Sequence, residues 1–185
     1  MKVLKTLLSA VLAGMCIGFG GGVFLALESK VLGAFFFTCG LFCVCTFGLK
    51  LFTGKVCYVF QNGRDYALEL PVIWLGNLLG TVLTAWLMNA SRLAPYAEKA
   101  AGMCQVKAED GLGSLFVLGI LCNIFIYIAV ESFNKNPHEL GKYLGLFFGV
   151  MVFILSGYEH CVADMFYVSA AGCWSGDMLL RLSAL

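Results

Sequence analysis

Long apolar stretches separated by short polar segments dominate the chain. A helix needs about 20 apolar residues to cross the hydrocarbon core of a bilayer, and each main stretch reaches that length. The pattern predicts five membrane-spanning segments, at about residues 3–27, 31–61, 66–88, 111–133 and 140–171. Residues 172–185 are too few to cross, so we expect either a sixth helix that is largely missing or a five-span protein.

Composition places the chain in lipid rather than water. Hydrophobic residues make up 61% of the 185 residues and charged residues only 12%, whereas a soluble domain carries about 25% charged residues. A soluble fold of this size could not hide so much apolar surface. We therefore predict an all-α membrane protein with a single transmembrane domain over residues 1–185, located as a multi-pass protein in the cell (plasma) membrane. The net charge of +1 gives no electrostatic reason to expect a nucleic-acid partner.

The N-terminal stretch has two readings. Lys2 and Lys5 followed by an apolar run are typical of a cleaved signal peptide. The run over residues 3–27 is longer than a signal peptide needs, and it lacks a convincing A-x-A cleavage site. We expect a retained first span with its basic end in the cytoplasm.

The second and fifth spans are too long for one crossing and carry polar residues near their middles. Lys50 and Lys55 flank the second span's segment 51–54, and Ser156-Gly157-Tyr158-Glu159-His160 interrupts the fifth, followed by Asp164. Ionisable groups at this depth are costly unless they face protein or water. We predict that both helices are broken, at about residues 51–54 and 156–160.

The two breaks fall at matching places in two halves of the chain, residues 1–90 and 91–185. Paired broken helices are the mark of an inverted-repeat transporter with its site near the membrane midplane. The freed N–H groups of a half-helix favour anions. A bundle with two ordinary kinks is the alternative, although intramembrane ionisable residues are usually functional.

Glycines at four-residue spacing occur in three spans, which allows close helix packing. The pairs are Gly14 with Gly18, Gly18 with Gly22, Gly76 with Gly80, and Gly145 with Gly149. The nine cysteines lie mostly in apolar segments and form no CxxC pair, so we expect reduced, structural thiols and no metal site. No cofactor is expected.

Several motifs resemble the formate/nitrite transporter family of formate, nitrite and hydrosulfide channels. Leu51-Phe52-Thr53-Gly54-Lys55 looks like the family's loop in the second span, and Gly157-Tyr158-Glu159-His160-Cys161-Val162-Ala163-Asp164-Met165 resembles its fifth-span signature, usually G-F-E-H-x-x-A-N-M. Trp74-Leu75-Gly76-Asn77 and Leu121-Cys122-Asn123 fit the third and fourth spans. The resemblance covers almost the whole chain, in the right order.

The resemblance implies an aquaporin-like inverted repeat of three plus three helices, with the second repeat incomplete here. It also implies a homopentamer in the lipid bilayer, each protomer with its own pore for small monovalent anions and protons. Two departures stand out. Asp164 replaces the usual Asn, and the sixth span is absent beyond its beginning.

The resemblance also implies a substrate pathway. In it, His160 would protonate the permeating anion, so that a neutral acid crosses the constriction, and imidazole suits this because it titrates near neutral pH. Thr53 and Asn123 resemble residues beside the histidine, and Lys107 resembles a lysine that draws anions in. Four further pathway residues resemble apolar constrictions, which gate by excluding water: Phe37 and Phe153 on the outer side, and Leu41 and Leu51 on the inner side. Phe52, in the same loop motif as Thr53, is also expected along the pathway.

Several residues also have a purely structural interpretation. His160 could only hold the bundle together, Lys107 could be a solvated loop lysine, and we expect Glu159 to point away from the pore. An enzyme is not expected, because one His160-x-x-x-Asp164 pair without a third group makes a poor active site. Two functions compete with an anion pore: an aquaporin-like pore for neutral solutes and a non-transporting scaffold. Among the family's formate, nitrite and hydrosulfide channels, the compact loops and Thr53-Gly54-Lys55 resemble those of the hydrosulfide-type members.

Overall fold

The computed structural model describes residues 2–185, and within this range the chain consists of helices and their connections, with no strand. The helices, in chain order, are α1 (Lys2–Ala26), α2 (Lys30–Thr46), α3 (Thr53–Val56), the 3₁₀ turn η1 (Val59–Gln61), α4 (Arg64–Asn89), α5 (Tyr96–Glu109), α6 (Leu112–Lys135), α7 (Glu139–Ser156), α8 (Cys161–Ala171) and α9 (Gly176–Ala184).

Four of these helices, α1, α4, α6 and α7, are long and apolar enough to cross a membrane. Their outward faces remain apolar. Leu8 and Leu12 of α1 are 56% and 51% exposed, and α6 presents Phe116 and Ile120 in the same way. Exposed apolar rows of this kind fit hydrocarbon rather than water as the surrounding solvent. The five spans expected from the apolar pattern are all present, and the chain is a multi-pass membrane protein.

The second and fifth spans are broken, as the mid-span charges predicted. Helix α2 ends at Thr46 and α3 begins at Thr53, while α7 ends at Ser156 and α8 begins at Cys161. A glycine in the left-handed region follows each first half: Gly48 with φ 62° and Gly157 with φ 76°. Glycine adopts this conformation at no steric cost, so it can end a helix sharply. The first break opens a few residues earlier than expected because Gly48, and not Gly54, makes the turn.

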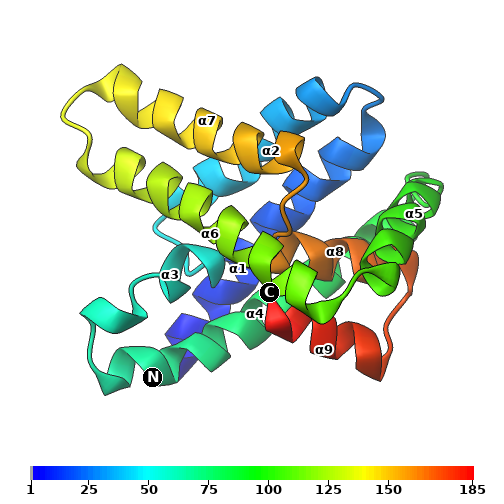
Figure 1. Cartoon of the computed structure of the whole chain (residues 1–185), viewed down its shortest axis with the longest axis horizontal. Coiled ribbons are helices and arrows are strands. Elements are labelled where there is room, and N and C mark those ends of the chain that lie inside the picture. The colour runs from blue at the N-terminus through cyan, green and yellow to red at the C-terminus, as the bar shows by residue number, and fades with distance from the viewer. Residues whose placement is uncertain (1) are drawn as a thin grey trace.

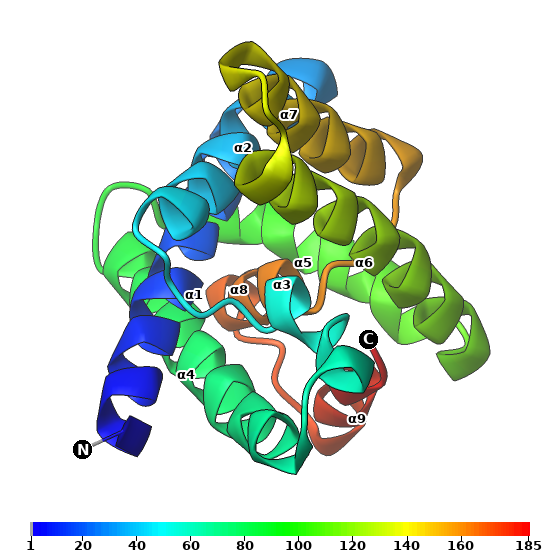
Figure 2. The same cartoon turned by 90° about the vertical axis from the view of Figure 1, so that its left-hand side faces the viewer.

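The long helices enclose the two short half-helices. Helix α1 packs on α4 and α2, and α6 packs on α7, while α8 lies against α4 and α5. Figure 1 shows α3 and α8 on either side of the middle of the molecule, and in Figure 2 they line up near its centre, with α1 and α4 on one side and α6 on the other. The two half-helices therefore occupy the interior, where the bundle can satisfy their polar ends.

Glycine lets α1 and α4 approach to backbone contact. A Cβ at Gly80 would overlap the Val11 carbonyl oxygen and lie 2.8 Å from the Met15 nitrogen, and a Cβ at Gly76 would lie 2.5 Å from the Ala10 Cβ. Close backbone approach is how membrane helices gain van der Waals contact without a hydrophobic drive. The glycine spacing in these two spans therefore serves α1–α4 packing.

One helix was not expected from the apolar pattern. Helix α5 (Tyr96–Glu109) forms in the polar stretch between the third and fourth spans, and its charged and small residues give no membrane-spanning signal. It folds back beside α8 (Figure 1). Helix α9 covers the beginning of the expected sixth span and packs on α6 and α8.

Alanine at two glycines tests the close approach of α1 and α4. Gly80→Ala should destabilise the detergent-solubilised protein by about 2 kcal/mol, since overpacking a tight contact costs about 1–3 kcal/mol. Gly102→Ala is the matched control, because a Cβ there meets nothing within 4 Å and alanine favours a helix interior. Thermal unfolding of both variants is the measurement. Equal stability of the two would show that α1 and α4 do not rely on this contact.

Candidate functional site

The two broken helices meet at a buried hydrogen bond. His160 Nε2 lies 3.0 Å from Thr53 Oγ1, although the residues are 107 positions apart. Thr53 is fully buried and His160 is 2% exposed. Thr53 is the first residue of α3, and His160 is the N-cap of α8. The structure thus brings together the two polar residues that the sequence placed in matching breaks.

The partners of His160 determine where its proton resides. Nδ1 accepts a hydrogen bond from the Ala163 backbone N–H at 3.0 Å, so Nδ1 carries no proton. The neutral ring must therefore carry its proton on Nε2 and donate it to Thr53 Oγ1. With its oxygen accepting from the histidine, the Thr53 hydroxyl keeps its own proton available for another acceptor. A second proton on the ring would need Nδ1, and hence the loss of the bond to Ala163.

The first break is held by side chains from α1 and α4. Asn77 Oδ1 accepts from the Phe52 N–H at 2.8 Å, and Asn77 Nδ2 donates to the Lys50 carbonyl at 3.0 Å. Ser9 Oγ accepts from the Lys50 N–H at 3.1 Å. Backbone groups freed inside a membrane must find such partners, since unsatisfied groups are costly there. Asn77 belongs to the Trp74-Leu75-Gly76-Asn77 motif, but its role in fixing the break was not predicted from the sequence.

Apolar side chains close the interior on both sides of the Thr53–His160 bond. The Phe37 and Phe153 rings meet edge to face with centroids 6.2 Å apart, and Phe153 stacks on the His160 ring at 5.4 Å. Leu41 and Leu51 are each 1% exposed. These four residues were expected to form two constrictions, and all four are buried around the central pair.

Two small cavities lie beyond these apolar residues. The first, which we call the Lys107 cavity, measures about 140 Å³ and is lined by residues that include Phe37, Phe153, His160 and Lys107. The second, the Lys55 cavity, measures about 110 Å³ and is lined by residues that include Leu41, Leu51 and Lys55. Each expected constriction thus borders its own cavity.

The two cavities open towards opposite ends of α1. Phe24, near the end of α1, lines the Lys107 cavity. The Lys55 cavity is lined by Gly48 and Leu49, and the adjoining Lys50 contacts Thr6 and Ser9 near the beginning of α1. Because α1 crosses the membrane, the cavities lie towards its two faces. The arrangement is two cavities separated by apolar side chains and one polar pair.

Lys107 lies inside a buried ion cluster. Its Nζ is 2.8 Å from Glu159 Oε2 and 3.2 Å from Asp164 Oδ1, and the lysine is 5% exposed. Burial lowers the pKa of Lys107, but the charges of Asp164 and Glu159 raise it by more, so the pKa lies above its ordinary value and the amine stays charged. A solvated loop lysine is thereby excluded. Glu159 was expected to point away from the pore, which was wrong: its pairing with Lys107 brings it to the cavity wall.

Two expected pathway residues lie elsewhere. Asn123 donates from Nδ2 to the Gly119 carbonyl at 2.9 Å and borders a different cavity, of about 520 Å³, next to Trp74 and Leu185. Phe52 lines that same cavity. Neither residue hydrogen-bonds His160 through its side chain among the described contacts. Their roles in a pathway stay predictions.

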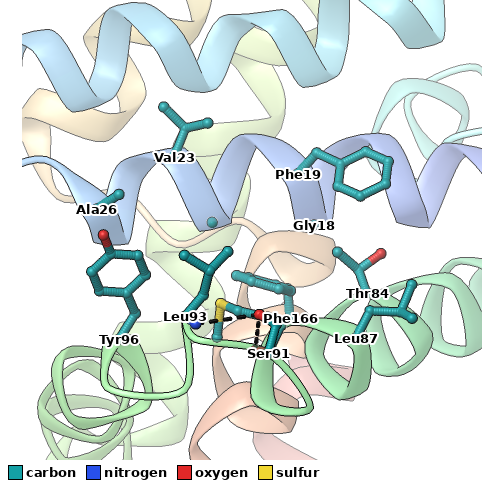
Figure 3. A pocket seen from close by; sticks show the side chains of 12 residues that line it. Gly18, Phe19, Val23, Ala26, Thr84, Leu87, Ser91, Leu93, Tyr96 and Phe166 are labelled. Carbon is teal, nitrogen blue, oxygen red and sulfur yellow. Dashed lines mark hydrogen bonds between the residues drawn. The ribbon is translucent and has the colours of Figure 1, made fainter.

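A further cavity, of about 420 Å³, opens on the side of the bundle between α1 and the end of α4. Figure 3 shows its wall, to which α1 contributes Phe19 and Val23 and α4 contributes Leu87. All of its described lining side chains are uncharged, and it excludes His160 and Lys107. This cavity is suited to apolar contents rather than to an anion.

The chain resembles known membrane transporters along nearly all of its length. Residues 1–182 match the family model described as formate/nitrite transporter. The uncharacterized transporter YrhG of Bacillus subtilis is 28% identical over 200 residues, which covers 92% of this chain and 74% of the relative. Formate-nitrite transporter 2 of Toxoplasma gondii is 30% identical over 85% of this chain, which spans 36% of that longer relative.

Solved structures share the fold. A structure described as a pentameric formate channel with formate bound superimposes with a TM-score of 0.78 at 25% identity, covering 98% of this chain and 81% of the channel. An FNT family ion channel gives a TM-score of 0.84 at 25% identity, with 98% and 80% covered. The all-helical fold with broken second and fifth spans is therefore that of these channels.

Replacing Asn77 tests whether its amide holds the first break. Asn77→Leu keeps the volume but leaves the Phe52 N–H and Lys50 carbonyl without partners, so we expect a loss of about 3 kcal/mol, at about 1–3 kcal/mol for each buried unsatisfied group. Asn89→Leu is the control, because Asn89 makes one bond, to the Ala170 carbonyl, at the exposed end of α4. It should cost about 1 kcal/mol. Thermal unfolding in detergent measures both, and a loss for Asn77→Leu no greater than the control's would contradict this role.

Proposed function

This chain belongs to the formate/nitrite transporter family, and we propose that it forms a transmembrane passage for small monovalent anions such as formate, nitrite or hydrosulfide. The family consists of transporters and channels rather than enzymes. The anion would enter one cavity, receive a proton at the Thr53–His160 pair and cross the apolar constrictions as a neutral acid. The observation that carries this proposal is the buried bond between the tips of two broken helices, with a cavity on either side.

The cost of moving charge explains why a proton is needed. An ion without a compensating partner loses its hydration in an apolar constriction, and the penalty far exceeds thermal energy. Phe37 and Phe153 on one side, and Leu41 and Leu51 on the other, offer no polar contact of their own. A weak acid such as formic acid avoids the penalty once it is protonated. A passage built this way favours anions that accept a proton readily over the anions of strong acids.

The central pair can deliver that proton through one hydroxyl. Burial disfavours the charged imidazolium while the site is empty. An anion beside Thr53 reduces this cost by its own charge, and the N-terminus of α8 adds a favourable dipole. The ring then takes a proton on Nδ1 as the bond to Ala163 gives way, at a cost of about 1 kcal/mol. It passes its Nε2 proton to Thr53, whose hydroxyl proton moves to the anion.

The proposal also includes an oligomeric state and a membrane location. We propose a homopentamer in the plasma membrane with one pathway in each protomer, because the superimposed formate channel is described as pentameric. The pathway residues are those whose side chains surround the two cavities and the central pair. They are His160, Thr53, Phe37, Phe153, Leu41, Leu51 and Lys107.

His160→Asn separates proton delivery from packing. The asparagine Oδ1 can replace Nδ1 as acceptor of the Ala163 N–H and keep the cap of α8, so we expect the variant to fold and assemble. It has no titratable proton, so formate flux should fall by about a hundredfold, the lower range for a positioned proton donor, and lose its dependence on pH. Flux into proteoliposomes across pH, beside a check of oligomer size, is the measurement. An unchanged pH profile in a correctly assembled variant would show that His160 is structural only.

Two substitutions of Thr53 test the relay through its hydroxyl. Thr53→Val removes the hydroxyl at constant shape and leaves Nε2–H without an acceptor, so formate flux should fall at least about tenfold, given about 1–3 kcal/mol for a lost buried partner. Thr53→Ser keeps the hydroxyl and should retain most of the flux. Equal flux in the two variants would exclude the hydroxyl from the relay.

A further inference from the structure

The ion cluster of the Lys107 cavity holds more negative than positive charge. Lys107 is the single ammonium between two carboxylates, Glu159 and Asp164, and all three side chains are largely buried, at 6%, 13% and 4% exposed. Fully ionised, the cluster carries a charge of −1. A buried charge without a partner is expensive, so a cluster of this kind normally binds one further cation or proton.

The groups around Asp164 offer no second cation. Four weak acids feel its charge, and thiols and phenols are uncharged near neutral pH: Cys104, Cys122, Cys161 and Tyr167. His160 also lines the cavity, with both ring nitrogens already bonded and a single proton. Lys30 lines the cavity too, but it is an exposed residue and its Nζ donates to the Leu155 carbonyl at 3.2 Å. Among the described residues, Lys107 alone therefore faces the two carboxylates directly.

Oδ2 of Asp164 is the atom at which a further proton or cation would be bound. Oδ1 contacts Lys107, whereas Oδ2 is buried and has no hydrogen-bond partner among the described residues. Glu159 is the neighbouring carboxyl group, because Lys107 Nζ lies 2.8 Å from Glu159 Oε2 and 3.2 Å from Asp164 Oδ1 and so holds the two side chains together. A shared proton would satisfy the orphan oxygen and bring the cluster of Lys107, Glu159 and Asp164 to zero net charge.

We propose that Glu159 and Asp164 share one exchangeable proton beside Lys107, and that this carboxyl pair is the proton-loading site of the Lys107 cavity. The inference rests on the proposed function, because the proton is destined for the central pair or for the anion. The pair lies on the cavity wall together with His160. When the carboxyl pair gives up its proton, the cluster becomes negative, and uptake of the next proton from bulk water restores neutrality.

The substitution of Asp for the family's usual Asn is what creates this site. With Asn at position 164, Lys107 and Glu159 would already form a neutral pair, and no exchangeable proton would be needed. With Asp164, the cluster of Lys107, Glu159 and Asp164 is neutral only while it holds a proton. The pair therefore loads the pathway with protons at a pH where few are free in solution, and it favours weakly basic anions, which can accept them.

Infrared spectroscopy of the full chain in lipid tests the shared proton directly. The pH-difference spectrum should contain the carbonyl stretching band of a protonated carboxyl group, shifted in heavy water. Asp164→Asn should abolish this band, because Lys107 and Glu159 then balance each other, and Glu159→Gln should abolish it for the same reason. His160→Asn should leave it in place. Absence of the band in the wild type, or its persistence in Asp164→Asn, would overturn the proposal.

Transport of formate tests what the proton is used for. Wild-type flux should stay nearly constant with rising pH until the pair loses its proton. In Asp164→Asn it should fall about tenfold per pH unit over that same range, following the free proton concentration, and match the wild type in acid. If His160→Asn alters the pH profile and Asp164→Asn does not, the central relay stands and the proton-loading role is refuted. If neither variant alters it, both ideas fail.

Discussion

A helix broken inside a membrane must have its freed backbone groups satisfied by the protein, and the rest of this structure depends on that constraint. Gly48 and Gly157 make the breaks sterically possible, but they leave N–H and carbonyl groups that lipid cannot satisfy. Asn77 provides for the first break, and His160 caps the second through the Ala163 N–H. The close α1–α4 packing on glycine is what brings Asn77 within reach. Helix packing, the capping of both breaks and the position of His160 are thus one arrangement.

The same arrangement sets the electrostatics around His160. The cap bond keeps Nδ1 of His160 unprotonated, which directs the ring's proton towards Thr53. Apolar residues on both sides make any net charge costly at this point. The charged groups lie instead in the Lys107 cavity, where Lys107 faces two carboxylates. Under the proposed function, a mobile proton rather than a fixed charge accompanies the anion, because the neutral acid leaves the interior without net charge.

Sequence patterns predicted the spans and the breaks, because apolar length and mid-span charges are local signals. The matching positions of Thr53 and His160 also follow from the chain, through the family resemblance. The role of Asn77 and the pairing of Glu159 with Lys107 do not. Each joins segments from different parts of the chain, and neither contact changes the spacing of apolar residues along the sequence. Helix α5, which carries Lys107, was not predicted because its polar composition resembles that of a loop.

The voltage dependence of formate flux tests the central claim most directly. Proteoliposomes holding the wild-type protein would be clamped at different membrane potentials with a potassium ionophore, and formate uptake measured at fixed pH on both sides. If the anion crosses the constriction only as a neutral acid, uptake is the same at every potential and is accompanied by one proton per formate. Uptake that rises and falls with the potential, without accompanying protons, would show that the bare anion crosses and would contradict the account.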